Sequence, residues 1–349
     1  MSAGLEGDAP PDEPEQSLGL AREAGIHQLS IPTPFLVGRV NCYLIEDDPL
    51  TLVDTGPNSA KALDELEQAL GQRGHRVEDL ELIILTHQHI DHVGLLEILA
   101  RRSGAEVAAF HLLEGYLRDF AASAAADDAF SMQTMLRHGV PPEVTTALGA
   151  VGAAFRGFGS SGPVTSPLRD GDRLTLRDRT LSIQHRPGHS PSDTLFWDEP
   201  RGILIAGDHL LARISSNPLI SRPLDPATAP ADPVRERGHA LVDYIASQRR
   251  TRELGAQLVL GGHGPPVREP AALVDERLRG YDRRARKILR MLSDGPQTAY
   301  DIASRMWGNV AVTQAFLTIS EVLGHIDLLI ADGRVQEDGE GSVTRFCAR

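Results

Sequence analysis

The chain has 349 residues, 41% of them hydrophobic, and a formal net charge of −13 at pH 7. This length favours two domains, and the apolar fraction is enough to build a substantial core. The negative charge repels polyanions at long range and so counts against a nucleic-acid partner, and no apolar run approaches the roughly 18 residues expected of a membrane span.

The first 20 residues are rich in Asp, Glu and Pro. A segment of this composition buries too little apolar surface to fold, so we expect residues 1–20 to form a disordered acidic tail. The same residues lack the basic start and apolar core of a secretory signal. The two cysteines, Cys42 and Cys347, lie far apart and make no disulfide framework. We therefore expect a cytoplasmic protein.

Hydrophobic periodicity predicts an alternation of strands and helices after the tail. Residues 28–53 predict two opening strands, around 41–45 and 50–53, and residues 60–71 predict a helix with one apolar face. A buried strand at 82–85, a helix from about 94 to 102 and a strand at 106–110 follow. Residues 111–160 are alanine-rich and predict a helical insertion, either a lid or substrate wall or a plain packing unit.

Four potential metal ligands follow the buried strand at 82–85: His87, His89, Asp91 and His92. Histidine is a common metal ligand because its neutral ring offers a lone pair at physiological pH, and an Asp oxygen suits zinc or a similar divalent ion. Alternate residues His87 and His89 leave an extended segment on the same side. Asp91 and His92 lie where the chain turns and can face a second point, so the pattern predicts two metals.

Three further candidate ligands occur in the same setting of an apolar strand, a Gly or Pro break and a polar side chain. They are His189, Asp208 and His263. Glycine permits the tight turn that points the next side chain back over the strand ends. The segment Val53-Asp54-Thr55-Gly56 adds another carboxylate after a strand.

Taken together, these motifs resemble the metallo-β-lactamase superfamily, and specifically its broad hydrolase branch that includes glyoxalase II. The matching pieces span residues from about 28 to 268. The resemblance implies an α/β (α+β) fold, a four-layer αββα sandwich with the metals at one edge between the two sheets. It assigns one metal to His87, His89 and His189 and the other to Asp91, His92 and His263. It also implies that Asp208 bridges both metals and that Asp54 orients a ligand.

The resemblance also implies the chemistry. Two divalent ions, Zn²⁺ by default with iron or manganese also suited to the ligands, would supply a metal-bound hydroxide that attacks a small-molecule thioester, ester or lactone. Asp91 and Asp208 are the predicted catalytic residues. Because true β-lactamases of the superfamily generally have Cys or Ser at or near the bridging position, Asp208 argues against antibiotic hydrolysis. The alternatives are an endoribonuclease or phosphodiesterase of the same fold, an iron-dependent persulfide dioxygenase-like enzyme, and a regulatory metal site.

The loop after Asp208, from about 210 to 230, is expected to line the cleft. Its residues Arg213 and Asn217 are candidate substrate contacts, as is Tyr116 in the insertion.

The last part of the chain predicts three helices, at about 285–292, 298–307 and 312–330, and a β-hairpin of residues 333–337 and 342–346. This order resembles a winged helix, which accompanies one group of glyoxalase II-like hydrolases. We therefore divide the chain into the tail, a catalytic domain at 21–280 and a winged-helix-like domain at 281–349. Residues 312–330 hold no Lys or Arg, and the hairpin tip is acidic, which disfavours DNA binding. We expect the winged-helix-like domain to pack against the catalytic domain, to form homodimer contacts or to contribute a wall of the substrate cleft.

Overall fold

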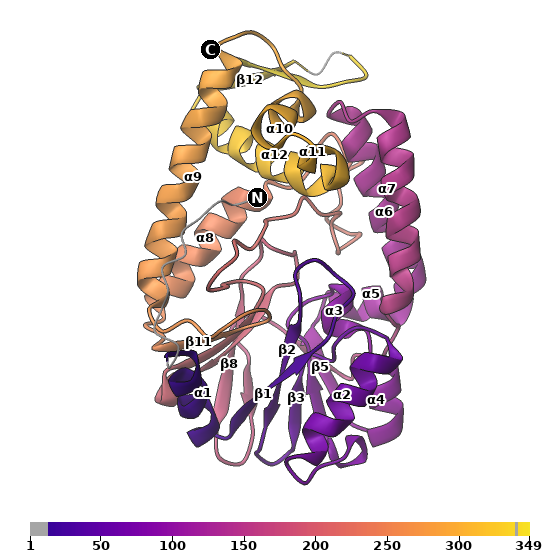
Figure 1. Ribbon diagram of the computed structural model, residues 1–349, viewed down its shortest axis with the longest axis vertical. Coiled ribbons are helices and arrows are strands. Elements are labelled where there is room, and N and C mark those ends of the chain that lie inside the picture. The colour runs from indigo at the N-terminus through magenta and orange to yellow at the C-terminus, as the bar shows by residue number, and fades with distance from the viewer. Residues whose placement is uncertain (1–12, 339–340) are drawn as a thin grey trace.

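The computed structural model describes residues 13–338 and 341–349 and contains two sheets packed face to face (Figure 1). The first sheet has the strand order β1-β2-β3-β4-β5-β6 and the second β11-β10-β9-β8-β7. The strands of the first are β1 (Ile26–Ile31), β2 (Val40–Ile45), β3 (Thr51–Val53), β4 (Leu82–Ile84), β5 (Glu106–Phe110) and β6 (Ser166–Leu168). Those of the second are β7 (Arg173–Thr175), β8 (Thr180–His185), β9 (Thr194–Asp198), β10 (Ile203–Gly207) and β11 (Leu258–Gly261).

Alternating side chains of these strands divide between an inner and an outer core. Tyr43 and Ile45 of β2 pack between the sheets against Phe196 and Leu260, whereas Cys42 of the same strand packs on the outer face. This two-residue period is what a strand buried on both faces requires. Helices α2 (Ala60–Gly71) and α4 (Leu96–Ser103) cover the outer face of the first sheet. Helix α9 (Pro270–Leu292) covers the second, which confirms the predicted four-layer αββα sandwich.

The segment predicted to be disordered, residues 1–20, overlaps a helix at its carboxyl-terminal end. Residues Glu13–Glu23 form helix α1, which packs against β1. Ala21 is buried in the core between the sheets, so a tertiary contact stabilises a segment whose composition favours disorder. Residues 1–12 of the predicted tail lie outside the described residues.

The region from 111 to 160 forms three helices, α5 (Leu113–Arg118), α6 (Phe120–Arg137) and α7 (Pro142–Phe155). Short 3-10 turns lie at η1 (Val77–Asp79), η2 (Arg156–Phe158) and η3 (Glu199–Arg201). Figure 1 shows α6 and α7 side by side along one flank of the molecule, reaching from the sheets to the carboxyl-terminal helices. Phe130 and Met135 of α6 are buried against those helices.

The carboxyl-terminal part contains α10 (Ala299–Trp307), α11 (Val310–Thr313), α12 (Ala315–Ala331) and a hairpin of β12 (Val335–Asp338) and β13 (Arg345–Ala348). Its core includes side chains of α6, α9 and the loop around Ile220 and Val234 as well as its own. The predicted boundary between residues 280 and 281 lies within the continuous helix α9. Helix α8 (Ala240–Glu253) packs against both α9 and α12. Among the described residues, every helix is too short or too polar to cross a membrane.

Candidate metal centre

The seven predicted metal ligands come together at one edge of the sandwich. His87 and His89 follow β4, and Asp91 and His92 lie in the short helix α3 (Ile90–Val93), one residue later. The other three come from the second sheet, because His189 lies in the loop between β8 and β9, Asp208 follows β10 and His263 lies two residues beyond β11. The edge where these strands end therefore collects side chains from both sheets.

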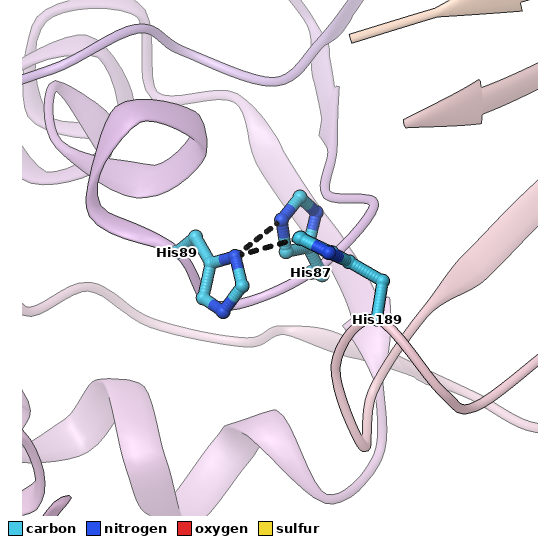
Figure 2. A group of neighbouring side chains, drawn as sticks. All are labelled: His87, His89 and His189. Atoms are coloured by element: carbon cyan, nitrogen blue, oxygen red, sulfur yellow. Dashed lines mark hydrogen bonds between the residues drawn. The ribbon is translucent and has the colours of Figure 1, made fainter. Parts of the chain in front are cut away.

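Three histidines point their ring nitrogens at one another (Figure 2). His89 Nδ1 lies 3.0 Å from His87 Nε2 and 3.0 Å from His189 Nε2. All three rings are buried or nearly so. Since a neutral imidazole has one N–H, such a convergence of three nitrogens favours a shared cation.

A second group consists of Asp91, His92 and His263. His263 Nε2 lies 3.3 Å from Asp91 Oδ2, and His92 Nε2 lies 4.0 Å from Asp91 Oδ1. Within each of the two groups the potential ligand atoms lie within 4.8 Å of one another.

Asp208 lies between the two groups. One carboxylate oxygen is 3.5 Å from His92 Nε2, and the other is 3.4 Å from His263 Nε2 and 3.6 Å from His189 Nε2. A single carboxylate thus faces histidines of both groups, which is the arrangement that a bridging ligand needs.

The residues fit two divalent ions on two physical grounds. Ligands bound tetrahedrally to zinc at about 2.0–2.1 Å lie about 3.3 Å apart, close to the separations at this centre, which are 3.0 to 3.6 Å except for the 4.0 Å between His92 Nε2 and Asp91 Oδ1. In addition, His92 Nε2 and Asp208 Oδ1 are buried and face each other at 3.5 Å, and neither makes a hydrogen bond with a described residue. Buried polar atoms without partners are rare and costly, and an ion would satisfy both.

The electrostatics of the centre also favour positive charge. Burial disfavours a charged ring at His92, yet the carboxylates of Asp54 and Asp208 outweigh burial and raise its pKa well above the usual value. At His263 the carboxylate of Asp208 likewise outweighs burial, and the pKa of the His263 ring rises to about 10. At His89 burial dominates and lowers the pKa to about 3, so that ring stays neutral. The carboxylates therefore require nearby positive charge, which bound cations supply.

Asp54 holds the ring of His92. Its Oδ2 lies 2.8 Å from His92 Nδ1 and accepts the Thr86 hydroxyl at 2.7 Å, while its Oδ1 accepts the Thr86 backbone N–H at 2.8 Å. Asp54 has φ 57°, in the left-handed region that non-glycine residues rarely occupy. Such strain persists where surrounding contacts fix the residue, as these three hydrogen bonds do.

The glycine before His263 makes room for the centre. A Cβ at Gly262 would lie 2.3 Å from Asp208 Oδ1 and 2.7 Å from His92 Cε1. Any side chain here would displace a candidate ligand.

The three candidate substrate contacts have different environments. Tyr116 lies in the hydrophobic core, and its hydroxyl donates to Asp127 at 2.8 Å. This environment suits a packing role, and the substrate contact of Tyr116 stays a prediction. Arg213 is exposed, and no described residue pairs with it. Asn217 contacts the centre through its backbone, because its carbonyl oxygen lies 3.1 Å from His189 Nδ1.

Several partners of the ligands have no signature in the sequence. The Arg39 carbonyl lies 2.8 Å from His263 Nδ1, and the Asn217 carbonyl lies 3.1 Å from His189 Nδ1. Each carbonyl thereby orients its histidine with the Nε2 atom toward the centre. Every residue carries a backbone carbonyl, so the sequence does not indicate which carbonyls contact the candidate ligands. Thr86 could have been suspected from its position beside His87.

Comparisons with known proteins agree with this geometry. The family described as the metallo-beta-lactamase superfamily matches residues 36–263. The chain is 32% identical over 318 residues to the probable metallo-hydrolase YqjP of Bacillus subtilis, covering 91% of this chain and 96% of that protein. It is similar to the crystal structure of metallo-beta-lactamase family protein TTHA1429 from Thermus thermophilus, with a TM-score of 0.74, 28% identity and coverage of 93% and 99%. A shorter match, 33% identical over 127 residues, covers 36% of this chain and 40% of acyl-coenzyme A thioesterase MBLAC2 of Bos taurus.

Proposed function

The chain belongs to the metallo-beta-lactamase superfamily, and on that premise we propose that it is a metal-dependent hydrolase of a small-molecule thioester, ester or lactone. One observation carries the proposal, namely that two groups of buried ligands share the carboxylate of Asp208. His87, His89 and His189 would hold one ion, and Asp91, His92 and His263 the other.

Zinc is our first choice for both positions, because imidazole and carboxylate ligands suit it, although iron and manganese accept the same donors. When bound, such ions lower the pKa of a coordinated water from 15.7 to about 7 and polarise the oxygen of a carbonyl or phosphoryl group.

Asp91 is the residue we assign to positioning the attacking water. Burial raises the pKa of its carboxyl, but the neighbouring rings of His92 and His263 outweigh burial and lower it below the usual value. Asp91 is thus ionised at neutral pH and can accept a hydrogen bond from an attacking water. Asp208 would hold both ions in place, and Asp54 would keep the His92 ring oriented.

Two observations support an acyl substrate. The relative MBLAC2 is named as an acyl-coenzyme A thioesterase. Arg213, exposed on the loop after Asp208 and without a partner among the described residues, could meet an anionic part of the leaving group. Helix α12, by contrast, contains no Lys or Arg, which disfavours an RNA substrate along that surface.

The test is metal analysis combined with a panel of acyl thioesters, lactones and a generic phosphodiester. Two ions per chain together with turnover of a thioester, ester or lactone would support the proposal. Cleavage of the phosphodiester alone would favour a nuclease, and one iron without any hydrolysis would favour oxygen chemistry. Either of these two results would overturn the acyl hydrolase.

A further inference from the structure

Exposed large apolar side chains lie on segments that contact the metal centre or that neighbour such segments. Ten such side chains are exposed among the described residues, and seven of them lie on four segments: the β1–β2 loop, α7, the loop after Asp208, and the turn from α11 to α12. They are Leu36, Val37, Val151, Phe155, Ile214, Val312 and Leu317. Single exposed apolar residues are ordinary, whereas several of them on neighbouring segments indicate a binding surface.

The β1–β2 loop, residues 32–39, connects directly to the centre. Its last residue, Arg39, places its carbonyl oxygen 2.8 Å from the ring of His263, and the next residue, Val40, forms a β-bridge with His263. At the tip Leu36 is 93% exposed. Figure 1 shows this loop rising from the sheets toward α11 and α12.

Helix α7 borders the same loop. Phe35 packs edge-to-face against Phe155 at a centroid distance of 5.4 Å and against Phe158 at 5.8 Å. Phe158 in turn accepts a hydrogen bond from the backbone of Asn58, close behind Asp54 in the chain. The exposed edge of Phe155 therefore lies next to the loop that carries Leu36.

The loop after Asp208 and helix α12 form the other side. The Asn217 carbonyl contacts His189, and its side-chain amide donates to the carbonyl of Leu317, in the first turn of α12, at 3.3 Å. Leu317 is thus two hydrogen bonds from a candidate metal ligand, and Ile214 lies three residues before Asn217. The carboxyl-terminal helices therefore supply part of the surface around the centre.

From these contacts we infer that the substrate has a long apolar acyl chain, which lies between the β1–β2 loop on one side and Ile214 and Leu317 on the other. The inference rests on the proposed hydrolase function and specifies its substrate class. Because the β1–β2 loop and the loop after Asp208 each contact a candidate metal ligand through a backbone carbonyl, a chain attached to a carbonyl at the metals would leave the centre between them. The exposed Leu36 would gain a buried environment when the acyl chain binds.

The test uses the full-length chain loaded with zinc and a series of thioesters of one thiol, from acetyl to dodecanoyl. We expect kcat/KM to rise with chain length by up to about fourfold for each methylene that becomes buried. Leu36→Ser and Leu317→Ser should lower the ratio of kcat/KM for the dodecanoyl thioester to kcat/KM for the acetyl thioester by about tenfold. Leu20→Ser, at a leucine on α1 whose exposure of 44% is close to the 37% of Leu317, is the control for an exposed leucine far from this surface in the chain.

Binding of a series of alkyl thioethers up to dodecyl, none of which can be hydrolysed, separates the two hypotheses. If thioesters are cleaved but neither kcat/KM nor thioether affinity depends on chain length, the acyl-chain inference is wrong and the hydrolase proposal stands. If no thioester, ester or lactone is cleaved but the dodecyl thioether binds and Leu36→Ser weakens it, the apolar site stands and the hydrolase proposal fails. If Leu36→Ser instead converts a dimer to a monomer and chain-length dependence is unaltered, the surface is a dimer interface and the inference is overturned.

Discussion

Replacing Asp54 by asparagine should weaken one metal position far more than the other. Asp54 makes three buried contacts, two with Thr86 and one with the ring of His92. An asparagine has one acceptor oxygen, so its amide nitrogen must face at least one of these donors. Leaving a buried donor unpaired costs about 1–3 kcal/mol, or about 5- to 150-fold in an equilibrium constant. We expect a loss of about 10- to 100-fold in affinity at the position that includes His92.

The assay is competition with a chromophoric zinc chelator, which resolves two successive affinities per chain. Affinity at the His87, His89 and His189 position should change less, since Asp54 reaches these rings only indirectly, through the Thr86 hydroxyl that lies 3.0 Å from His87 Nδ1. Asp47→Asn is the control, because Asp47 is a buried carboxylate that binds Arg179 away from the centre. That variant should lose stability but keep both zinc affinities. If Asp54→Asn retained both affinities within about twofold, the orienting role of Asp54 would be refuted.

Three more results are expected. Asp208→Ala should lose at least one metal and most turnover, and a fully active variant with two metals would contradict the bridging role. Gly262→Ala should lower metal content and cost about 1–3 kcal/mol of stability through its contact with Asp208, whereas Gly71→Ala, with open space around it, should not. Burial, then the charges of Arg237 and Arg137, lower the pKa of His138 to about 3, against about 6.5 in the unfolded chain. Between these values the unfolded chain binds a proton that the folded chain does not, so stability should fall as pH falls. In urea unfolding, the free energy of unfolding should fall between pH 7 and pH 5 by up to about 2 kcal/mol less in His138→Gln than in the unmodified chain. Equal falls in the two proteins would contradict this assignment.

Much of the fold follows from local pattern. The helix predicted at 60–71 and the strand at 106–110 coincide with α2 and β5, because an apolar face in the first and a short apolar run in the second match their periods. The ligand segments were predictable for the same reason, since each follows an apolar strand and a turn. Whether these ligands bind two metals stays a prediction.

Other features depend on tertiary contacts that no local pattern reports. Helix α1 forms on a segment with the composition of a disordered tail because Ala21 packs between the sheets. The aromatic ring of Tyr116 could line a cleft or a core by its sequence, and its burial and its hydrogen bond to Asp127 become visible only in the structure. The carbonyls of Arg39 and Asn217 are invisible in the sequence, because side-chain identity says nothing about where a backbone oxygen points.

The hydrogen bond from Asn217 to Leu317 has a consequence for how this chain could be recombined. A chimera that took residues 281–349 from a relative would change both the helix that holds Asn217 and the hydrophobic core shared with α6. His189 would then lose the fixed geometry of its carbonyl partner, even though the graft touched no ligand. A chimera should therefore keep the orientation of His189 only when residues 209–234 are transplanted together with residues 281–349.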